Sequence, residues 1–332
     1  MSTRSVILLF DDQSDRAGRA ELLKGSSGCQ VQFIDLHNKD VIAEIKAAAK
    51  TFPAANLILV DHVLDKTSPA SQEMVNKGST IVPLLREHWN ACPILAITAA
   101  PDACQKDISS EAYEAIFSLD QFSRLASYVS SIIAGYAAIR KSGKNLAGLM
   151  ALLRVPTDDQ DALVGVLPEE VRRTLGQPEC AHYMFRWFYN TFYRHPGLLY
   201  GHAWASLVLG VRGKAFEKYE KHIMRAAYTG IFRDKESPRW WKSRMYSLLL
   251  PKSARRFSVS IQQAAYERLH IDEVDFSGCY KCKEKWPEVM ACVDDAALDC
   301  ADMKPMHLRC TRAHKMANAK PYFEELRVML GD

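Results

Sequence analysis

The sequence lacks several features that would place it in a specialised class of protein. Its longest apolar runs fall well short of the ~18 residues that a membrane-spanning helix needs. With only 16 Gly and 14 Pro in 332 residues, it is neither collagen-like nor a low-complexity chain. It has no internal repeat, Walker loop, GxSxG, HExxH or dinucleotide fingerprint, so no recognisable effector enzyme is predicted.

Signals for export are also missing. The N-terminal sequence MSTRSVILLFDD reaches two aspartates after a short apolar run and has no small-residue cleavage site, so we expect no signal peptide. Nine cysteines, an odd number, indicate reduced thiols or metal ligands rather than a disulfide framework. We therefore expect a cytoplasmic protein that does not use a membrane as a partner.

The charge is unevenly distributed along the chain. The formal net charge is +4, but residues 201–260 carry 13 Lys and Arg against 4 Asp and Glu, a net of +9, while residues 1–144 carry 15 against 16. Such a basic segment could face nucleic acid, a phosphorylated partner or an acidic protein surface. It could equally be a set of solvated helix faces.

Short apolar runs alternate with helix-length segments in the first 140 residues. This alternation predicts an α/β fold, in which a doubly wound five-stranded parallel sheet is covered by helices on both faces. The predicted strands are Ser5–Phe10, Val31–Ile34, Leu57–Val60, Ile94–Thr98 and, more weakly, Ile116–Phe117.

The remainder of the chain has a different pattern. A long helix over Gln121–Lys141 closes the first domain, which we place at 1–142. Residues 145–270 are rich in aromatic residues at helical spacing and predict a mainly α-helical output or partner domain. Residues 271–332 form a smaller cysteine-bearing terminal region.

Polar residues stand where the predicted strands end. Asp11 and Asp12 follow the first strand, Asp61 the third and Thr98 the fourth. The carboxyl ends of parallel strands are where ligands bind in such sheets. A carboxylate can accept a phosphoryl group when Mg²⁺ neutralises the charges that meet there, and Mg²⁺ prefers carboxylate ligands. Taken singly, each residue is also an ordinary strand terminator.

These pieces together resemble the receiver domain of two-component response regulators. The matching segments are ILLFDD, LILVDHVLD, ILAITAA and IFSLDQF, and the resemblance covers roughly residues 5–140. It implies a magnesium site, a phosphoacceptor and a pair of switch residues. By position, the resemblance assigns the metal to Asp11, Asp12, Asp61 and the backbone carbonyl of Val63. It makes Asp61 the phosphoacceptor as well, Thr98 the switch hydroxyl and Phe117 the switch aromatic.

The sequence departs from this family at one position. Where the resemblance implies a lysine on the last strand, three residues after Phe117, the chain has Asp120. A carboxylate there repels a phosphoryl group, although Arg124, one helical turn along, could substitute. The domain could then switch weakly, act as a phosphate sink or work as a phosphorylation-independent pseudo-receiver. The long segment Asp65–Ser79 also predicts that the helix after the acceptor strand begins late.

The terminal region contains candidate zinc ligands. Cys279 and Cys282 form a CxxC pair, and Cys310 and His314 follow at C-x3-H spacing. These four residues could make a tetrahedral Cys3His site, and Cys292 or Cys300 could replace either of the second pair. Free thiols are the alternative, whereas redox catalysis is not expected from a CxxC outside a βαβ pattern.

Two aromatic groups in the middle of the chain have competing interpretations. Trp240 and Trp241, beside Arg239, Lys242 and Arg244, could stack on bases, but we expect them to pack inward. A separate stripe of aromatic residues at helical spacing is likewise expected to belong to the core. It consists of Phe185, Trp187, Phe188, Phe192 and Tyr193.

Two classes of function follow. The first is a signalling protein, a phosphoacceptor rather than a turnover enzyme, whose partners are a histidine kinase and a downstream effector, with homodimer formation left open. Divergent receivers fused to unfamiliar helical domains look similar to components of bacterial anti-phage two-component systems, which implies a defence role by analogy. The second class is a nucleic-acid-binding regulator that uses residues 201–260.

Overall fold

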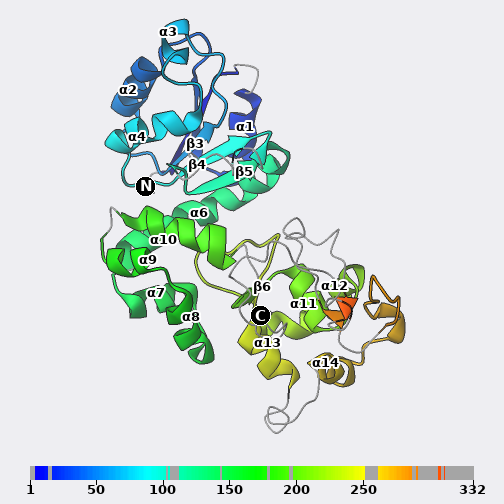
Figure 1. Cartoon of the computed structure of the whole chain (residues 1–332). Coiled ribbons are helices and arrows are strands. Elements are labelled where there is room, and N and C mark those ends of the chain that lie inside the picture. The colour runs from blue at the N-terminus through cyan, green and yellow to red at the C-terminus, as the bar shows by residue number, and fades with distance from the viewer. Residues whose placement is uncertain are drawn as a thin grey trace. The chain divides into compact units, whose positions relative to one another are not determined.

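The computed structural model describes residues 4–13, 17–101, 104, 112–142, 144–177, 180–193, 197–250, 261–285, 289–290, 306–307 and 310. The chain divides into two compact units, each of which is assembled from separate stretches of sequence (Figure 1). Unit 1 contains residues 1–153, 168–189 and 230–236, and unit 2 contains residues 154–167, 190–229 and 237–332. The sequence-based division after residue 142 does not include the two later stretches of unit 1.

A five-stranded parallel sheet forms the centre of unit 1. The strand order is β2-β1-β3-β4-β5, the doubly wound order in which the first and third strands are central neighbours. The prediction of a five-stranded parallel sheet is therefore confirmed. The strands are β1 (Val6–Asp11), β2 (Gln30–Asp35), β3 (Leu57–Asp61), β4 (Ile94–Thr98) and β5 (Ala115–Ser118).

Helices cover both faces of the sheet. Helices α1 (Gly18–Ser27) and α6 (Phe122–Ser142) lie together on one face, and α2 (Val41–Thr51) and α4 (Gly78–His88) lie on the other (Figure 1). After β3, only the four-residue α3 (Pro69–Gln72) precedes α4, so the following long helix begins late, as predicted. No helix among the described residues is long and apolar enough to cross a membrane.

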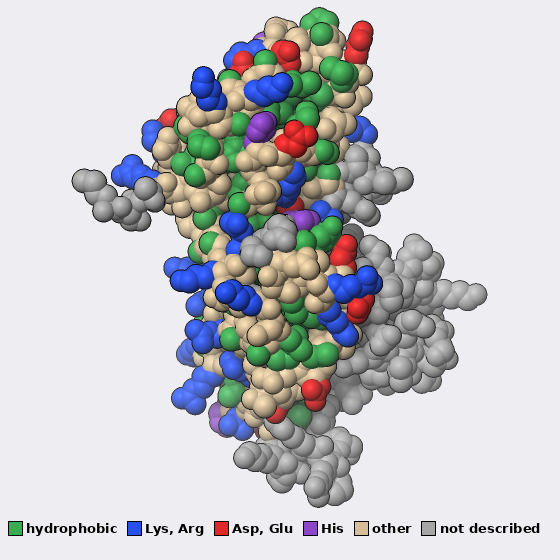
Figure 2. All heavy atoms as spheres, turned by 90° about the vertical axis from the view of Figure 1, so that its left-hand side faces the viewer, with side chains coloured by type: hydrophobic (Ala, Val, Ile, Leu, Met, Phe, Trp, Pro, Cys, Tyr) green, Lys and Arg blue, Asp and Glu red, His purple; other side chains and the backbone are tan. Residues whose placement is uncertain are grey.

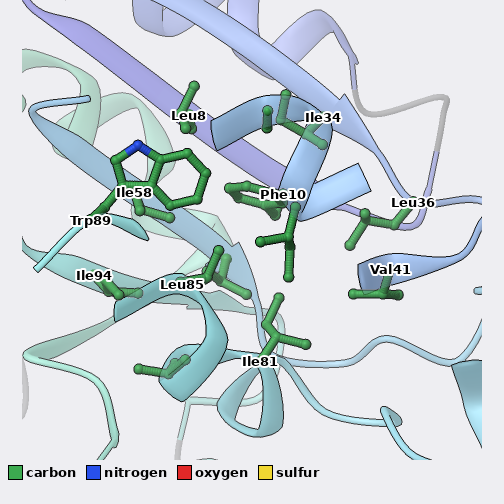
Figure 3. Close-up of a cluster of buried hydrophobic side chains, with 14 of the residues drawn as sticks. Leu8, Phe10, Ile34, Leu36, Val41, Ile58, Ile81, Leu85, Trp89 and Ile94 are labelled. Carbon is green, nitrogen blue, oxygen red and sulfur yellow. The ribbon is translucent and has the colours of Figure 1, made fainter. Parts of the chain in front are cut away.

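The core between the sheet and α2 and α4 is closely packed. Figure 3 shows Phe10 at its centre, with Trp89 beside it at a ring-centroid distance of 6.2 Å. Burying aliphatic side chains such as Ile81 and Leu85 stabilises the fold by roughly 1.5–3 kcal/mol each. The indole N–H of Trp89 donates to the Phe52 carbonyl at 2.8 Å, so this large ring brings no unsatisfied donor into the core.

Arg86 and Glu114 form an ion pair in the interior of this unit. Glu114, whose side chain is 1% exposed, accepts from the Arg86 guanidinium and from the backbone N–H of Ile94. Arg86 also donates to the Cys92 carbonyl at 2.6 Å. These bonds join the end of α4 to the starts of β4 and β5.

The later stretches of unit 1 add an aromatic cluster beneath α6. They contribute α9 (Glu169–Thr174) and α10 (Ala181–Trp187), next to α7 (Leu146–Leu153). The ring of Phe232 lies 4.8 Å from Phe185 and 4.9 Å from Phe188. Gly135 in α6 permits this approach, because a Cβ there would lie 2.4 Å from the Phe232 ring.

Unit 2 is mainly helical and has its own core. Trp240 and Trp241 are fully buried in it, which confirms that they pack inward. The five residues of the predicted core stripe are buried as well, Phe192 and Tyr193 in unit 2 and Phe185, Trp187 and Phe188 in unit 1. The elements of unit 2 are α8 (Gln160–Val166), β6 (Leu199–Tyr200), α11 (His202–Val208), α12 (Gly213–Ile223), β7 (Trp240–Trp241), α13 (Lys242–Leu249), α14 (Ile261–Leu269), β8 (Val289–Met290) and β9 (Met306–His307), and a π-helical stretch over Phe188–Tyr193 crosses from unit 1 into unit 2.

The helical pattern expected over residues 145–270 does not hold at Trp240 and Trp241. Trp240 and Trp241 form a strand that pairs with Tyr200 and Leu199, and the helix begins only at Lys242. Pairing with β6 satisfies backbone groups that a helix would otherwise satisfy, and it directs both indoles into buried positions. Helical periodicity in the sequence did not reveal a strand that is only two residues long.

We predict that Arg86→Ala lowers the free energy of unfolding by about 3–5 kcal/mol, because it leaves the buried carboxylate of Glu114 without its cation. Chemical denaturation measures the loss. The matched control is Arg173→Ala, which removes the exposed pair with Glu169 and is expected to cost less than about 1 kcal/mol. Equal losses in the two variants would contradict the role assigned to burial.

Candidate functional site

Three aspartates meet at the carboxyl edge of the sheet. Asp11 ends β1, Asp12 follows it, and Asp61 ends the neighbouring strand β3. Their exposed fractions are 1%, 0% and 4%, and one oxygen of each lies within 4.8 Å of the other two. Three buried carboxylates so close together repel one another, so this arrangement favours a bound cation or a bound proton.

The surroundings of Asp12 disfavour its ionised form. One of its oxygens accepts from the backbone N–H of Lys66 at 2.6 Å, whereas Oδ1 is buried and has no hydrogen-bond donor among the described residues. Burial raises the pKa of Asp12 above its ordinary value, and the charge of Asp65 acts in the same direction. A divalent cation would satisfy this oxygen, so the residues present fit a metal ion of the kind that carboxylates bind.

A positively charged side chain that the sequence analysis did not identify, that of Arg19, lies at this site. Arg19, in the first turn of α1, places Nη1 3.2 Å from Asp11 Oδ2. Its guanidinium also lies 6.0 Å from the ring of Phe122, the first residue of α6. The available signal was its position, because a helix that follows β1 in a parallel sheet starts near the carboxyl end of that strand.

Thr98 and Val63 occupy the same edge. Thr98 ends β4, is 1% exposed, and accepts through its hydroxyl from the backbone N–H of Ala100 at 3.2 Å. Val63 and Lys77 face each other in an isolated β-bridge. The two hydrogen bonds of this bridge are made by the neighbouring residues: the backbone N–H of Gly78 donates to the His62 carbonyl, and that of Leu64 donates to the Asn76 carbonyl. The bridge therefore does not use the Val63 carbonyl, the group that the resemblance assigns to the metal.

The close approach of α4 to the end of β3 depends on glycine. A Cβ on Gly78 would lie 2.2 Å from the backbone oxygen of Asp61. The backbone N–H of Gly78 donates to the His62 carbonyl at 2.8 Å, so the first residue of the helix is held directly against the end of β3. Only a residue without a side chain fits at this contact.

Phe117 and Asp120 have different surroundings. Phe117 is 6% exposed, and its ring lies 5.2 Å from that of Tyr189, which belongs to the later stretches of unit 1. Asp120 is exposed in the single 3-10 turn after β5, where its backbone N–H donates to Ser118 Oγ at 3.3 Å. The position that the resemblance assigns to a lysine thus carries a solvated carboxylate.

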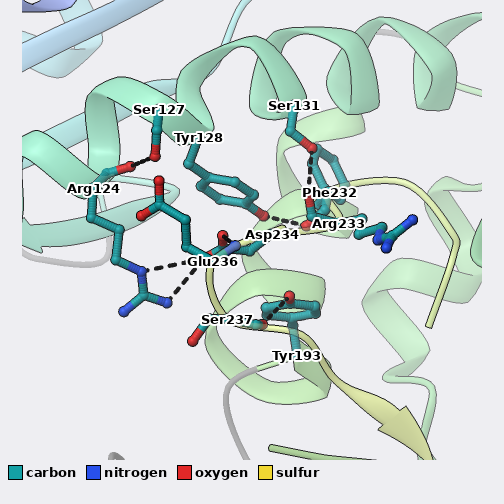
Figure 4. A network of polar contacts seen from close by, with 10 residues as sticks. All are labelled: Arg124, Ser127, Tyr128, Ser131, Tyr193, Phe232, Arg233, Asp234, Glu236 and Ser237. Carbon is teal, nitrogen blue, oxygen red and sulfur yellow. Dashed lines mark hydrogen bonds and ion pairs between the residues drawn. The ribbon is translucent and has the colours of Figure 1, made fainter. Parts of the chain in front are cut away.

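Arg124 binds a different carboxylate. Its guanidinium donates to Asp234 Oδ2 through Nη2 at 2.9 Å and Nε at 3.2 Å (Figure 4). Asp234 belongs to residues 230–236, which we call the strap. The strap is also bound to α6 by Tyr128 and Ser131, whose hydroxyls donate to the carbonyls of Phe232 and Arg233.

The predicted zinc ligands are brought together only in part. Cys279, Cys282 and Cys310 cluster with His307, and one ligand atom of each lies within 4.8 Å of the others. His307 was not among the sequence candidates, because it precedes Cys310 and so lies outside the C-x3-H pattern. The candidates His314, Cys292 and Cys300 lie outside the described residues.

Comparisons with known proteins find likeness in structure alone. No model of a protein family matches the chain, and no curated protein does. Among solved structures, a response regulator from Burkholderia multivorans is 21% identical and covers 35% of this chain and 82% of its own, at TM-score 0.25. The signal receiver domain of an HD-domain-containing protein from Pseudomonas fluorescens is 19% identical and covers 38% of this chain and 94% of its own, at TM-score 0.28.

The N-terminal sheet and its helices fit the doubly wound fold of a response-regulator receiver domain. The strand order is the one found in that class, and the acidic residues lie beyond the carboxyl ends of β1 and β3, where ligands bind in such sheets. A mainly helical part follows, as the sequence predicted.

We predict that Asp12→Asn raises the melting temperature in the absence of divalent ions. The amide carries no charge to desolvate or to be repelled by Asp11 and Asp61, and a gain of about 1–2 kcal/mol is expected. Millimolar Mg²⁺ should then stabilise the wild type but not the variant, as measured by thermal unfolding at pH 7. Equal stabilisation of both proteins by Mg²⁺ would exclude Asp12 as a ligand.

Proposed function

We propose that this chain is a two-component signalling protein that accepts a phosphoryl group on Asp61 from the phosphohistidine of a histidine kinase. The observation that carries the proposal is the convergence of Asp11, Asp12 and Asp61 at the carboxyl edge of the sheet. A carboxylate oxygen of Asp61 attacks phosphorus, the P–N bond to the kinase histidine breaks, and an acyl phosphate forms. The departing imidazole keeps the electron pair of that bond and takes up a proton.

Magnesium would be held by Asp11, Asp12, Asp61 and the carbonyl of Val63. When bound, the ion supplies positive charge between the attacking carboxylate and the phosphoryl oxygens. The chain itself positions the nucleophile. Asp61 Oδ1 accepts from the backbone N–H of Val63 at 3.3 Å, and burial of the carboxyl group limits competing contact with water.

Arg19 is proposed to supply the protein cation that the resemblance assigns to a lysine. Its guanidinium already bonds Asp11, so it lies beside the carboxylates rather than across the sheet edge. Thr98, buried at the end of β4, would donate its hydroxyl to a phosphoryl oxygen. Asp120 would oppose a strong response, because its negative charge stands where an attracting charge is expected.

Two contacts offer a route from the acceptor site to the rest of the chain. Phe117 packs on Tyr189, and the strap is bound to α6 through Arg124. Tyr189 and both ends of the strap continue directly along the chain into unit 2. A shift of β5 or α6 on phosphorylation would therefore be conveyed to the helical part, and a weak shift would make the protein a buffer for phosphate. A role in anti-phage defence remains an analogy.

The alternative, a nucleic-acid-binding regulator, gains no specific support. Trp240 and Trp241 are fully buried and cannot stack on bases. Lys218, which belongs to the basic segment 201–260, pairs with Asp272 and Asp275 of the same unit. Part of the positive charge of the segment is therefore neutralised by carboxylates of unit 2 itself. On the face drawn in Figure 2, Lys and Arg side chains are spread along the molecule, with other side chains between many of them.

We predict that Asp61→Asn abolishes labelling by a phosphorylated histidine kinase in the presence of Mg²⁺, because an amide is a poor nucleophile and a weaker metal ligand. Labelling is measured with radioactive phosphate, and the acyl phosphate is identified by its lability in hydroxylamine. Asp65→Asn, which changes a nearby carboxylate outside the cluster, serves as the control and should retain labelling. A wild type that no kinase labels would favour the pseudo-receiver.

We predict that Arg19→Ala slows labelling of Asp61 by roughly tenfold or more, the expected effect of losing one hydrogen bond to a charged group. Adding Asp120→Lys to this variant should restore part of the rate, because it provides a cation where the resemblance places one. Lys24→Ala on the exposed part of α1 is the control. An unchanged rate in Arg19→Ala would show that Arg19 only pairs with Asp11.

A further inference from the structure

The terminal part of unit 2 contains a compact group of sulfur and nitrogen ligands. Cys279 is 1% exposed and His307 is 4% exposed, while Cys310 is half-buried and Cys282 is exposed. The Sγ of Cys282 lies 3.2 Å from Nδ1 of His307. In a tetrahedral zinc site with Zn–S bonds near 2.3 Å, neighbouring ligand atoms are roughly 3.5–4 Å apart. The four ligand atoms lie within 4.8 Å of one another, so they would have to move only slightly closer together to bind zinc.

The CxxC pair is held in a tight hairpin. The backbone N–H of Cys279 donates to the Glu284 carbonyl at 2.8 Å, and that of Lys283 donates to the Cys279 carbonyl at 2.9 Å. Lys283 has a φ of 63°, a left-handed conformation that lets the chain reverse directly after Cys282. A bridge between Gly278 and Lys285 closes the hairpin. Both sulfurs are thus fixed by backbone geometry close to each other.

The second half of the group comes from a segment distant in sequence. His307 lies in β9, which pairs with β8, and its backbone N–H faces Cys279 Sγ at 3.5 Å. An N–H directed at the sulfur favours the thiolate, the form that binds metals. Two-residue strands provide few hydrogen bonds, so the pairing of β8 with β9 is too short to hold this segment by itself.

The hairpin is anchored to the core of unit 2. Phe276 packs on Tyr266 at 5.4 Å, and the backbone N–H of Ser277 donates to the Gly210 carbonyl at 2.9 Å. Cys282 and His307 are 25 positions apart, so an ion bound by both would close a long loop onto this anchored hairpin. Closing such a loop contributes directly to the stability of the folded state.

We propose that Cys279, Cys282, His307 and Cys310 bind one structural zinc ion that fastens the terminal region to the core of unit 2. Three thiols lose their protons to the solvent as Zn²⁺ binds, and the imidazole binds in its neutral form, so the complex carries one negative charge. Four protein ligands leave no open position for a substrate, which makes the site structural rather than catalytic. A redox pair would need only two sulfurs and gives no role to His307 and Cys310.

The test is the zinc content of the full-length chain, purified under reducing conditions and measured by mass spectrometry. The wild type is expected to contain about one equivalent. Cys279→Ser and His307→Ala should each lose most of the metal. The matched control is His314→Ala, which removes the histidine favoured by sequence spacing and should retain the full equivalent, because four ligands are already present.

Two results would overturn this assignment. One is metal-free wild type that takes up no Zn²⁺ on reconstitution, with the thiols of the cluster freely titratable. The other is loss of zinc from His314→Ala with retention in His307→Ala. Cobalt substitution in the wild type keeps the proposal testable if the variants fail to fold. Its spectrum should indicate tetrahedral thiolate coordination by three sulfurs, and an octahedral spectrum without thiolate bands would contradict the proposal.

Discussion

Mutual repulsion among three buried carboxylates is the constraint around which unit 1 is arranged. The apolar strands β1 and β3 are neighbours in the sheet, so Asp11, Asp12 and Asp61 are brought to one edge by the burial of residues such as Phe10 and Leu59. The backbone N–H of Lys66 and the guanidinium of Arg19 offset part of the repulsion. The remaining unfavourable charge makes this edge a candidate site for a cation.

Helix α6 links this edge to the later parts of the chain. Its buried residues, among them Leu125 and Val129, belong to the core of unit 1, and three polar residues of the same helix bind the strap. The Arg124–Asp234 pair joins positions 110 residues apart. Contacts between segments so distant in sequence are slow to form but make the unit cooperative once formed. The doubly wound sheet and its helices are thus extended by later segments of the chain.

The two units rely on different sources of stability. Unit 1 is held by an extensive apolar core and by the buried pair of Glu114 with Arg86. In unit 2, helices pack around Phe216 and Trp240, and Lys218 bridges to Asp272 and Asp275 near the start of the cysteine-bearing region. That region has little hydrophobic core among its described residues, so a metal ion would supply what packing does not.

Local patterns were sufficient to predict the sheet, its carboxylates and the inward packing of the tryptophans, because strand length, strand ends and apolar spacing are properties of neighbouring residues. The short strand β7 was missed because two residues leave no period to detect. Arg19, the strap and His307 were missed for another reason. Each of them contacts a residue of another element, and the C-x3-H spacing contains no information on β9. The sequence alone thus determined which chemical groups stand at the strand ends, and only the tertiary structure decided which cations and ligands lie beside them, because those neighbours are selected by packing across the chain.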